Sequence, residues 1–446
     1  MTTEETRTES PALVLFSGLL LTGALVFGLL FLMARSTYDS WGAMLIVPVL
    51  IALTIPALRR QAAAEKDPRL FAILMAALLL KLAGAMVRHY VAFDIYQGDA
   101  DAGDYHTFGV DFHEQFRSGN FETGLPSLTS THFIEFFTAI VYAIIGPTRL
   151  GGFLFYSWLG FWGLLFFYRA FVIAVPQGHR TRYARLLFFL PSLWYWPSSI
   201  GKEAWMTLTL GLVALGAAHV LSGRTIRGVS FAATGLWLAA IVRPHFAGIM
   251  AVALLAGYLF RRLPKELGTV APIVKGTAIA ILGVVALIFV NRADDYLQER
   301  GIQTDRGVTT ALSQTTERTA QGGSAFVPSI LDSPGRAPVA VATVLFRPLL
   351  VEAHNSQSLA AALEVTFLLF LSLVRWRSFF SALQTMREQP YLAFSIAYTG
   401  MMILALSSIA NFGILARQRI QLLPVFLVLL CLKPPIAREP DAANTT

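Results

Sequence analysis

About twelve long apolar runs constrain the fold of this chain more than any other feature of its sequence. A helix of about 20 apolar residues crosses the hydrocarbon of a bilayer. Backbone inside lipid must satisfy its own hydrogen bonds, and helices do this within one segment. We therefore expect an all-α polytopic membrane protein with about twelve transmembrane helices. The runs lie at 12–34, 41–58, 69–93, 149–174, 182–198, 202–222, 228–242, 245–262, 269–291, 358–376, 391–410 and 418–432.

Composition supports this class and excludes others. Hydrophobic residues make up 55% of the 446 residues and charged residues 14%, whereas a soluble domain carries roughly 25% charge. The single cysteine, Cys431, allows no intrachain disulfide and no cysteine-based metal site. The net charge of +8 comes from basic residues scattered through short loops, which is typical of topology signals rather than of nucleic-acid binding.

The basic loops also predict an orientation. Lys and Arg gather in alternate loops, including 59–69 and 180–185, if Phe133–Gly146 does not cross the membrane. The positive-inside rule places these loops and both termini in the cytoplasm. Segments 133–146 and 337–350 are then expected as interfacial helices on the outer face.

The same orientation gives the domain organisation. We predict one transmembrane domain over 1–432, with large outer loops at 94–148 and 292–357. The Pro-rich and polar segment 433–446 is expected to be a disordered cytoplasmic tail.

Three carboxylates follow the third apolar run within six residues. They are Asp99, Asp101 and Asp104, in an outer-loop stretch with glycines at two positions. Carboxylates in such a stretch can bind a divalent cation, take a proton, or both. The residues alone leave open a catalytic role for Asp99 and Asp104 and the ligation of Mg²⁺ or Mn²⁺ by all three aspartates. A solvated turn is the alternative reading of this stretch.

Several cations interrupt the ends of apolar runs on the expected outer face. Ionisable groups at such positions cost several kcal/mol unless they are paired or hydrated, which favours a functional role. Arg417 and Arg419 can each grip a phosphate bidentately. Pairing between neighbours or snorkelling to lipid headgroups is the structural alternative. The expected substrate-binding residues are Lys202, Glu203, Arg243, His245, Arg347, Arg417 and Arg419.

One further cation, Lys81, lies in the middle of the third apolar run. A buried cation needs a partner, and the sequence offers a buried acid in Glu364. We expect these two residues to form a structural pair.

The motifs on the expected outer face resemble those of a known superfamily. They are Gly98-Asp99 and Asp104-Tyr105 after an early helix, the turn Trp196-Pro-Ser-Ser-Ile-Gly-Lys202-Glu203, the break Arg243-Pro-His245 and the late Arg417-x-Arg419. Together they resemble the GT-C superfamily of polytopic glycosyltransferases and its bacterial polysaccharide-assembly relatives. The family's acidic loop usually follows the first helix, whereas here it follows the third.

The resemblance implies a function. The chain would move a sugar from a polyprenyl-phosphate-linked donor to a glycan or lipid acceptor, on the non-cytoplasmic face of a bacterial plasma membrane. Asp99 would take the catalytic position as base or metal ligand, with Asp101 and Asp104 in support. Membrane lipids are the other expected partners.

Three alternatives remain open on the residues alone. A polysaccharide polymerase or ligase of the O-antigen type would use the arginines to grip lipid diphosphates. A transporter or flippase would also use broken helices and intramembrane charges, although no internal repeat is visible. A structural or assembly protein is the third. The chain carries no Rossmann-type glycine fingerprint, which argues against a nucleotide-sugar donor.

Overall fold

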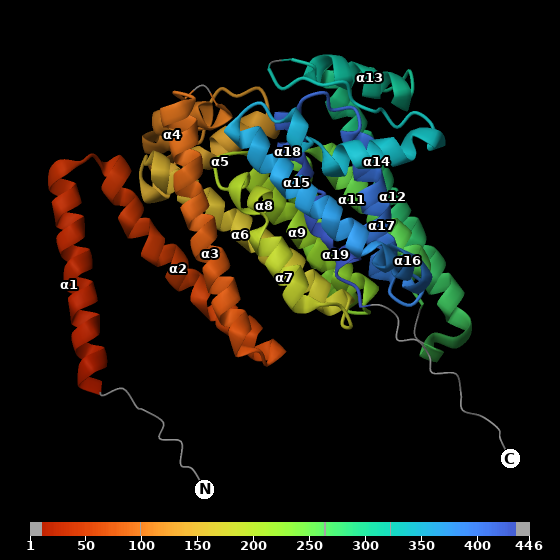
Figure 1. Cartoon of the computed structure of the whole chain (residues 1–446), viewed down its shortest axis with the longest axis horizontal. Helices are drawn as coiled ribbons and strands as arrows, with labels where there is room; N and C mark the ends of the chain where they lie inside the picture. Colours follow the sequence, from red (N-terminus) through yellow and green to blue (C-terminus); the bar gives the residue numbers. More distant parts are fainter. Residues whose placement is uncertain (1–10, 99, 263–264, 322, 434–446) are drawn as a thin grey trace, which may run out of the picture.

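The protein is helical throughout the part of the chain that its structure describes. The computed structural model describes residues 11–98, 100–262, 265–321 and 323–433, and within them no strand is present (Figure 1). In these residues, eight helices are long and apolar enough to cross a membrane, or nine if one bent pair is a single span. The chain is therefore a multi-pass membrane protein of the all-α class. The expected number of twelve spans is not confirmed.

The long apolar helices are the candidate membrane spans. They are α1 (Pro11–Arg35), α2 (Tyr38–Glu65), α3 (Pro68–Tyr90), α6 (Arg149–Ala174), α9 (Lys202–Leu221), α10 (Thr225–Val242), α12 (Ala271–Glu299) and α15 (Ser356–Val374). Shorter helices fill the gaps between them. These are α4 (Asp101–Arg117), α5 (Ser130–Ile145), α7 (Arg180–Phe189), α8 (Pro191–Tyr195), α11 (Pro244–Phe260), α13 (Val308–Thr319), α14 (Ala337–Phe346), α16 (Trp376–Thr385), α17 (Pro390–Leu406), α18 (Phe412–Arg419) and α19 (Leu423–Leu430).

Four of the apolar runs fold differently from the long single helices that we expected. Runs 245–262 and 391–410 give α11 and α17, each of 17 residues, at the lower limit for a span. Run 182–198 breaks at Pro191, because proline lacks the N–H that would continue α7 and forces Leu190 into an extended conformation. Run 418–432 contributes to the pair α18 and α19, which meet at a bend of 66°.

Helix α9 is the centre of the packed body. It lies between α6 and α10, and glycines bring these helices into backbone contact. A Cβ at Gly211 of α9 would lie 2.3 Å from the carbonyl oxygen of Gly163 in α6, and one at Gly216 would lie 2.4 Å from the backbone nitrogen of Ala232 in α10. Small residues at such crossings are typical of helix packing in membranes, since they allow close van der Waals contact.

Helix α1 lies apart from this body, next to the start of α2 (Figure 1). Its apolar side chains are mostly exposed, Leu19 and Phe27 among them. A helix that is apolar and exposed on all sides is stable only in an apolar solvent, which is what lipid provides.

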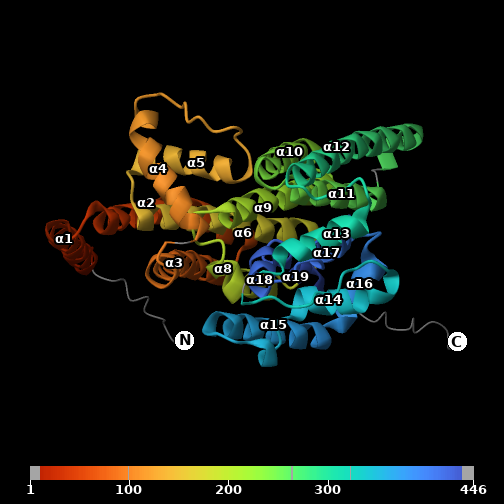
Figure 2. The ribbon, with the colours of Figure 1, turned by 90° about the horizontal axis from the view of Figure 1, so that it is seen from above.

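The short helices α4, α5, α13 and α14 gather at one end of the body (Figures 1 and 2). Helix α5 is apolar but has only 16 residues, which is shorter than the 18 required of a candidate span. Its length agrees with the expected non-spanning segment at 133–146. Helix α14 covers most of the second expected interfacial segment. The expected loop 292–357 begins later than predicted, because α12 continues to Glu299.

Candidate functional site

The site is built around the first turn of α9. A tight segment from Pro197 to Gly201 leads into this helix, and Lys81 of α3 forms hydrogen bonds to the start of the segment. The Lys81 ammonium donates to the carbonyl oxygen of Pro197 at 2.7 Å and to the hydroxyl of Ser198 at 2.9 Å. Its side chain is only 1% exposed. The buried lysine therefore fixes the turn that presents Lys202.

The predicted pair between Lys81 and Glu364 is wrong. Glu364 accepts hydrogen bonds from the backbone N–H and the hydroxyl of Ser192, at the start of α8. The first N–H groups of a helix lack intrahelical acceptors and attract a carboxylate, so Glu364 satisfies the start of α8. Lys81 instead satisfies carbonyl oxygens at the other end of this short helix, including that of Trp194 at 3.4 Å.

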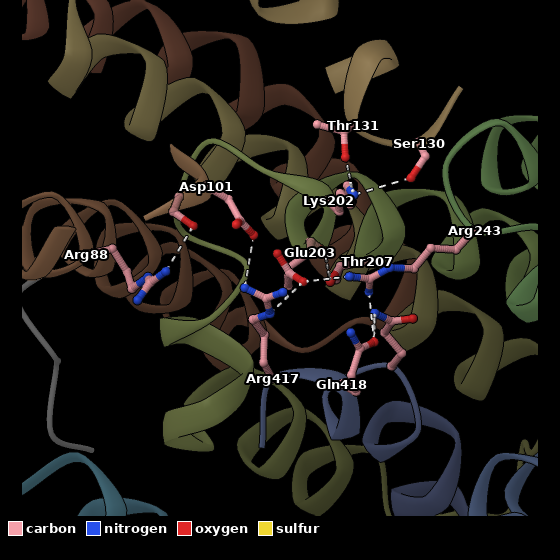
Figure 3. A network of polar contacts seen from close by, with 12 residues as sticks. Arg88, Asp101, Ser130, Thr131, Lys202, Glu203, Thr207, Arg243, Arg417 and Gln418 are labelled. Carbon is pink, nitrogen blue, oxygen red and sulfur yellow. Dashed lines mark hydrogen bonds and ion pairs between the residues drawn. The ribbon is translucent and has the colours of Figure 1, made fainter. Parts of the chain in front are cut away.

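Glu203 joins two arginines from distant parts of the chain (Figure 3). Its Oε1 lies 2.9 Å from Nη2 of Arg243 and 3.3 Å from Nε of Arg417. Arg243 occupies the break between α10 and α11, where Pro244 begins the second helix. Glu203 is 7% exposed and Arg243 is 6% exposed, so this is a buried ion pair. The carboxylate also lies in the first turn of α9, where the helix dipole favours negative charge.

The same arrangement extends to α4 and α18. Nη1 of Arg417 lies 3.2 Å from Oδ2 of Asp101, whose side chain is 60% exposed. Gln418, the next residue of α18, accepts a hydrogen bond from Nη1 of Arg243 at 2.9 Å. We call Asp101, Glu203, Arg243, Arg417 and Gln418 the ion-paired group. It ties α4, α9, α18 and the α10–α11 break together.

Lys202 points away from this group, toward the start of α5 (Figure 3). Its ammonium donates to the hydroxyl of Thr131 at 2.7 Å and to that of Ser130 at 3.3 Å. Nη2 of Arg300, the residue after α12, donates to the same Ser130 hydroxyl at 2.9 Å. Lys202 does not pair with Glu203, its neighbour in the sequence. We call Ser130, Thr131, Lys202 and Arg300 the cation corner.

The predicted acidic stretch is described only in part. Asp99 lies outside the described residues, and Asp101 and Asp104 occupy the first turn of α4. Asp104 is exposed. Among the described residues, no three acidic, His or Cys side chains come together as a metal site. Asp101 contacts the Arg417 cation, whose charge disfavours a second cation beside the same carboxylate. The described residues therefore do not fit the expected metal, and its binding remains a prediction.

Two predicted substrate-binding arginines lie outside both groups. Arg347 pairs with Glu352 and stacks over the rings of Phe326 and Phe412. Arg419 is buried and donates to the backbone carbonyl oxygen of Arg347, just after α14. A guanidinium at this place satisfies carbonyl oxygens that have no partner at a helix end. Arg419 therefore has a structural partner in the backbone.

Arg243 belongs to the ion-paired group, but His245, two residues later, does not. Its ring stacks on Tyr296 of α12 with the centroids 5.4 Å apart. The guanidinium of Arg300 in turn lies 4.4 Å from the centre of the Tyr296 ring, and the Tyr296 hydroxyl lies 3.4 Å from that of Ser130. His245 thus belongs to the support of the cation corner.

A titratable carboxyl borders the cation corner from α5. Burial raises the pKa of Glu135, and the charge of Asp104 on α4 raises it further. His132 and Lys202 act in the opposite direction and lower the pKa of the same carboxyl. Glu135 therefore loses its negative charge at a higher pH than an ordinary surface carboxylate does.

An apolar groove runs beside the polar groups on shared helices. It has a volume of about 530 Å³ and lies between α3, the α8 region and α15, with Arg419 of α18 in its lining. A second groove of about 550 Å³ shares Pro191, Ala360 and Glu364 with the first and continues along α15 toward Phe367. At the polar end, Arg88 of α3 lies over the ring of Trp196, which lines the first groove.

Sequence reasoning found most of the ion-paired group and missed most of the cation corner. We expect Lys202, Glu203, Arg243 and Arg417 in one site; the structure brings the last three into contact, whereas Lys202 turns toward α5. Arg300, Ser130 and Thr131 were not expected. The signal for the two hydroxyls is the Ser/Thr cluster 127–131 before an apolar helix, which is typical of a helix start.

In comparisons with protein families, curated proteins and solved structures, nothing matches this chain.

Proposed function

We propose that this protein is a membrane-embedded glycosyltransferase that takes its sugar from a lipid-phosphate donor. One observation carries the proposal: an apolar groove is lined by residues 194–196, and the short segment after them leads directly to Lys202 and Glu203 of the two polar groups. A lipid phosphate has a charged head and a long apolar chain, and this arrangement suits both parts. The motifs that resemble the GT-C superfamily support the same function.

The chemistry needs a base and a means of stabilising the leaving phosphate. In the proposed reaction the acceptor hydroxyl oxygen forms a bond to the anomeric carbon while the bond from that carbon to the phosphate oxygen breaks. The phosphate leaves with the electron pair, and a carboxylate takes the proton of the hydroxyl. Asp99 and the exposed Asp104 are the proposed carboxylates. The acceptor would be a glycan or lipid on the outer face of a bacterial plasma membrane, with both termini cytoplasmic.

The first test is a transfer assay with the full-length protein in lipid nanodiscs, a polyprenyl-phosphate sugar and candidate acceptors. Asp99→Asn keeps the size of the side chain but removes its ability to take a proton. We expect transfer to fall by about 10² to 10⁴. Asp111→Asn is the matched control, because Asp111 is an exposed aspartate of α4 that lies outside both polar groups.

Two outcomes would contradict the proposal. One is a wild-type protein that releases no sugar from any lipid-linked donor, and the other is an Asp99→Asn variant that keeps more than about a tenth of the wild-type rate. The same assay with a chelator tests the predicted Mg²⁺ or Mn²⁺. A loss of activity that Mg²⁺ restores would support metal ligation by the aspartates.

A polymerase of the O-antigen type is a second candidate. The excess of cations at the cation corner favours it, because a lipid diphosphate carries more negative charge than a monophosphate. The length of the product separates the two candidates: a polymerase extends the glycan repeatedly, whereas a single-transfer enzyme adds one sugar.

A further inference from the structure

The two polar groups differ in charge. The ion-paired group contains two arginines and two carboxylates, so its formal charges cancel. The cation corner contains Lys202 and Arg300, and both donate to hydroxyl groups. Among the described residues, no carboxylate lies within ion-pair distance of either cation. Two positive charges therefore meet without a negative partner.

The donors converge on one atom. The hydroxyl oxygen of Ser130 lies 2.9 Å from Arg300 Nη2 and 3.3 Å from Lys202 Nζ. A neutral hydroxyl compensates two cations poorly, because hydrogen bonds to charged acceptors are roughly twice as strong. An anion near this oxygen would contact both cations together with the hydroxyl of Thr131. The backbone N–H groups that begin α5 would add to the same attraction.

The corner is held in shape by an aromatic stack behind it. Tyr296 lies under the Arg300 guanidinium and stacks on His245, as described above. The Nδ1 atom of His245 is buried and has no hydrogen-bond partner among the described residues. Ser130 itself has φ of 54°, a conformation that residues other than glycine rarely adopt. The surroundings thus hold the hydroxyl where both cations reach it.

We propose that Lys202, Arg300, Ser130 and Thr131 form a binding site for a phosphoryl group. The inference rests on the proposed function in one respect, which is that the phosphoryl group belongs to the lipid donor. Arg300 and the start of α5 would then bind the phosphate, whereas Arg417 and Arg243 hold the helices together.

The test measures binding rather than transfer, with full-length protein in detergent. The probes are inorganic phosphate, farnesyl phosphate and farnesol, followed by calorimetry and by the shift in melting temperature. Arg300→Gln removes one charge, and Ser130→Gly removes the hydroxyl while suiting the positive φ. Arg306→Gln is the matched control, because this exposed arginine lies six residues further along the chain.

We expect Arg300→Gln to weaken binding of inorganic phosphate by at least about tenfold, since a hydrogen bond to a charged group is lost. Ser130→Gly should weaken it less, and Arg306→Gln should bind as the wild type does. A lipid headgroup would be identified as the ligand by two results together. Farnesyl phosphate would bind more tightly than inorganic phosphate, and farnesol would not displace inorganic phosphate. Equal affinities would identify a free phosphate.

The proposal fails if Arg300→Gln binds phosphate as tightly as the wild type, or if Arg306→Gln loses as much affinity. It also fails if the wild type binds neither phosphate probe. Phosphate binding that depends on Arg300 in a protein without transfer activity would support the site and contradict the proposed function. The two ideas are therefore tested separately.

Discussion

The ion-paired group and the cation corner begin from adjacent residues of α9 and have opposite character. Glu203 turns toward α18 and is enclosed by two arginines, while Lys202 turns toward α5 and meets a second cation. A buried carboxylate between two guanidinium groups has its partners already. Lys202 and Arg300 contact hydroxyl groups and have no carboxylate partner among the described residues. In this protein, the charges without an opposite partner are therefore the better candidates for ligand binding.

This difference gives the two groups separate roles. The ion-paired group joins helices that are far apart in the sequence, so its loss should be felt as lost stability. In the cation corner, Lys202 and Arg300 repel each other, so removing one of them should cost little stability. The loss should instead weaken the binding of an anion.

Glu203→Gln should have the largest effect on stability. The substitution keeps the size of the side chain but leaves Arg243 and Arg417 with Asp101 as the remaining carboxylate of the group. Breaking a buried pair in this way typically costs about 3–5 kcal/mol. Unfolding of the purified variant in detergent measures the loss. A melting temperature equal to that of the wild type would contradict the structural role of the group.

Lys202→Gln, one residue earlier, should leave stability within about 1 kcal/mol of the wild type or raise it. The half-buried Lys202 has no described carboxylate partner, so its removal leaves no opposite charge alone and relieves repulsion with Arg300. The same unfolding experiment serves as the measurement. A loss as large as that of Glu203→Gln would mean that the corner is also structural.

Glu135→Gln should have the smallest effect, a gain of a few-fold in the affinity for sulfate at pH 7. Ionised Glu135 partly cancels the charge of Lys202, and burial raises the pKa of this carboxyl. As pH falls from 7 into the acidic range, Glu135 takes up a proton before an ordinary carboxyl does, so sulfate should bind the wild type more tightly. Sulfate is the suitable probe because it does not titrate in this range.

The glutamine variant should lack the part of this pH dependence that comes from Glu135. The other charged groups facing Glu135 are His132 on α5, Asp104 on α4 and Lys202 on α9. Both proteins keep them, so the difference between the two curves isolates Glu135. Parallel curves would show that its charge does not influence the corner.

The fold class was predictable because apolar length carries it. Eight of the expected runs became long helices, since nothing in their sequences competes with helix formation in an apolar solvent. The broken runs were harder to read. Pro191 ends α7 in a run whose composition is otherwise continuous, and the bend between α18 and α19 depends on neighbours that the local sequence does not name.

The site was predictable where charge interrupts an apolar pattern. Lys202, Glu203, Arg243 and Arg417 stand out for this reason. Arg300 does not, because it follows a polar stretch that we assigned to a loop, whereas α12 carries the helix on to Glu299 and delivers Arg300 to α5. Which partner a charge finds is set by tertiary contacts, as the mistaken pairing of Lys81 shows.

The glycine contacts of α9 bear on how this site could change over evolution. Neither Gly211 nor Gly216 can gain a side chain without moving a neighbouring helix. The sequence of α9, which carries Lys202 at its start, therefore has little freedom to vary. The opposite wall, formed by the start of α5 and the end of α12, meets no such restriction at its exposed positions. We therefore expect sequence variation at this site to fall along α5 and α12 while α9 stays constant.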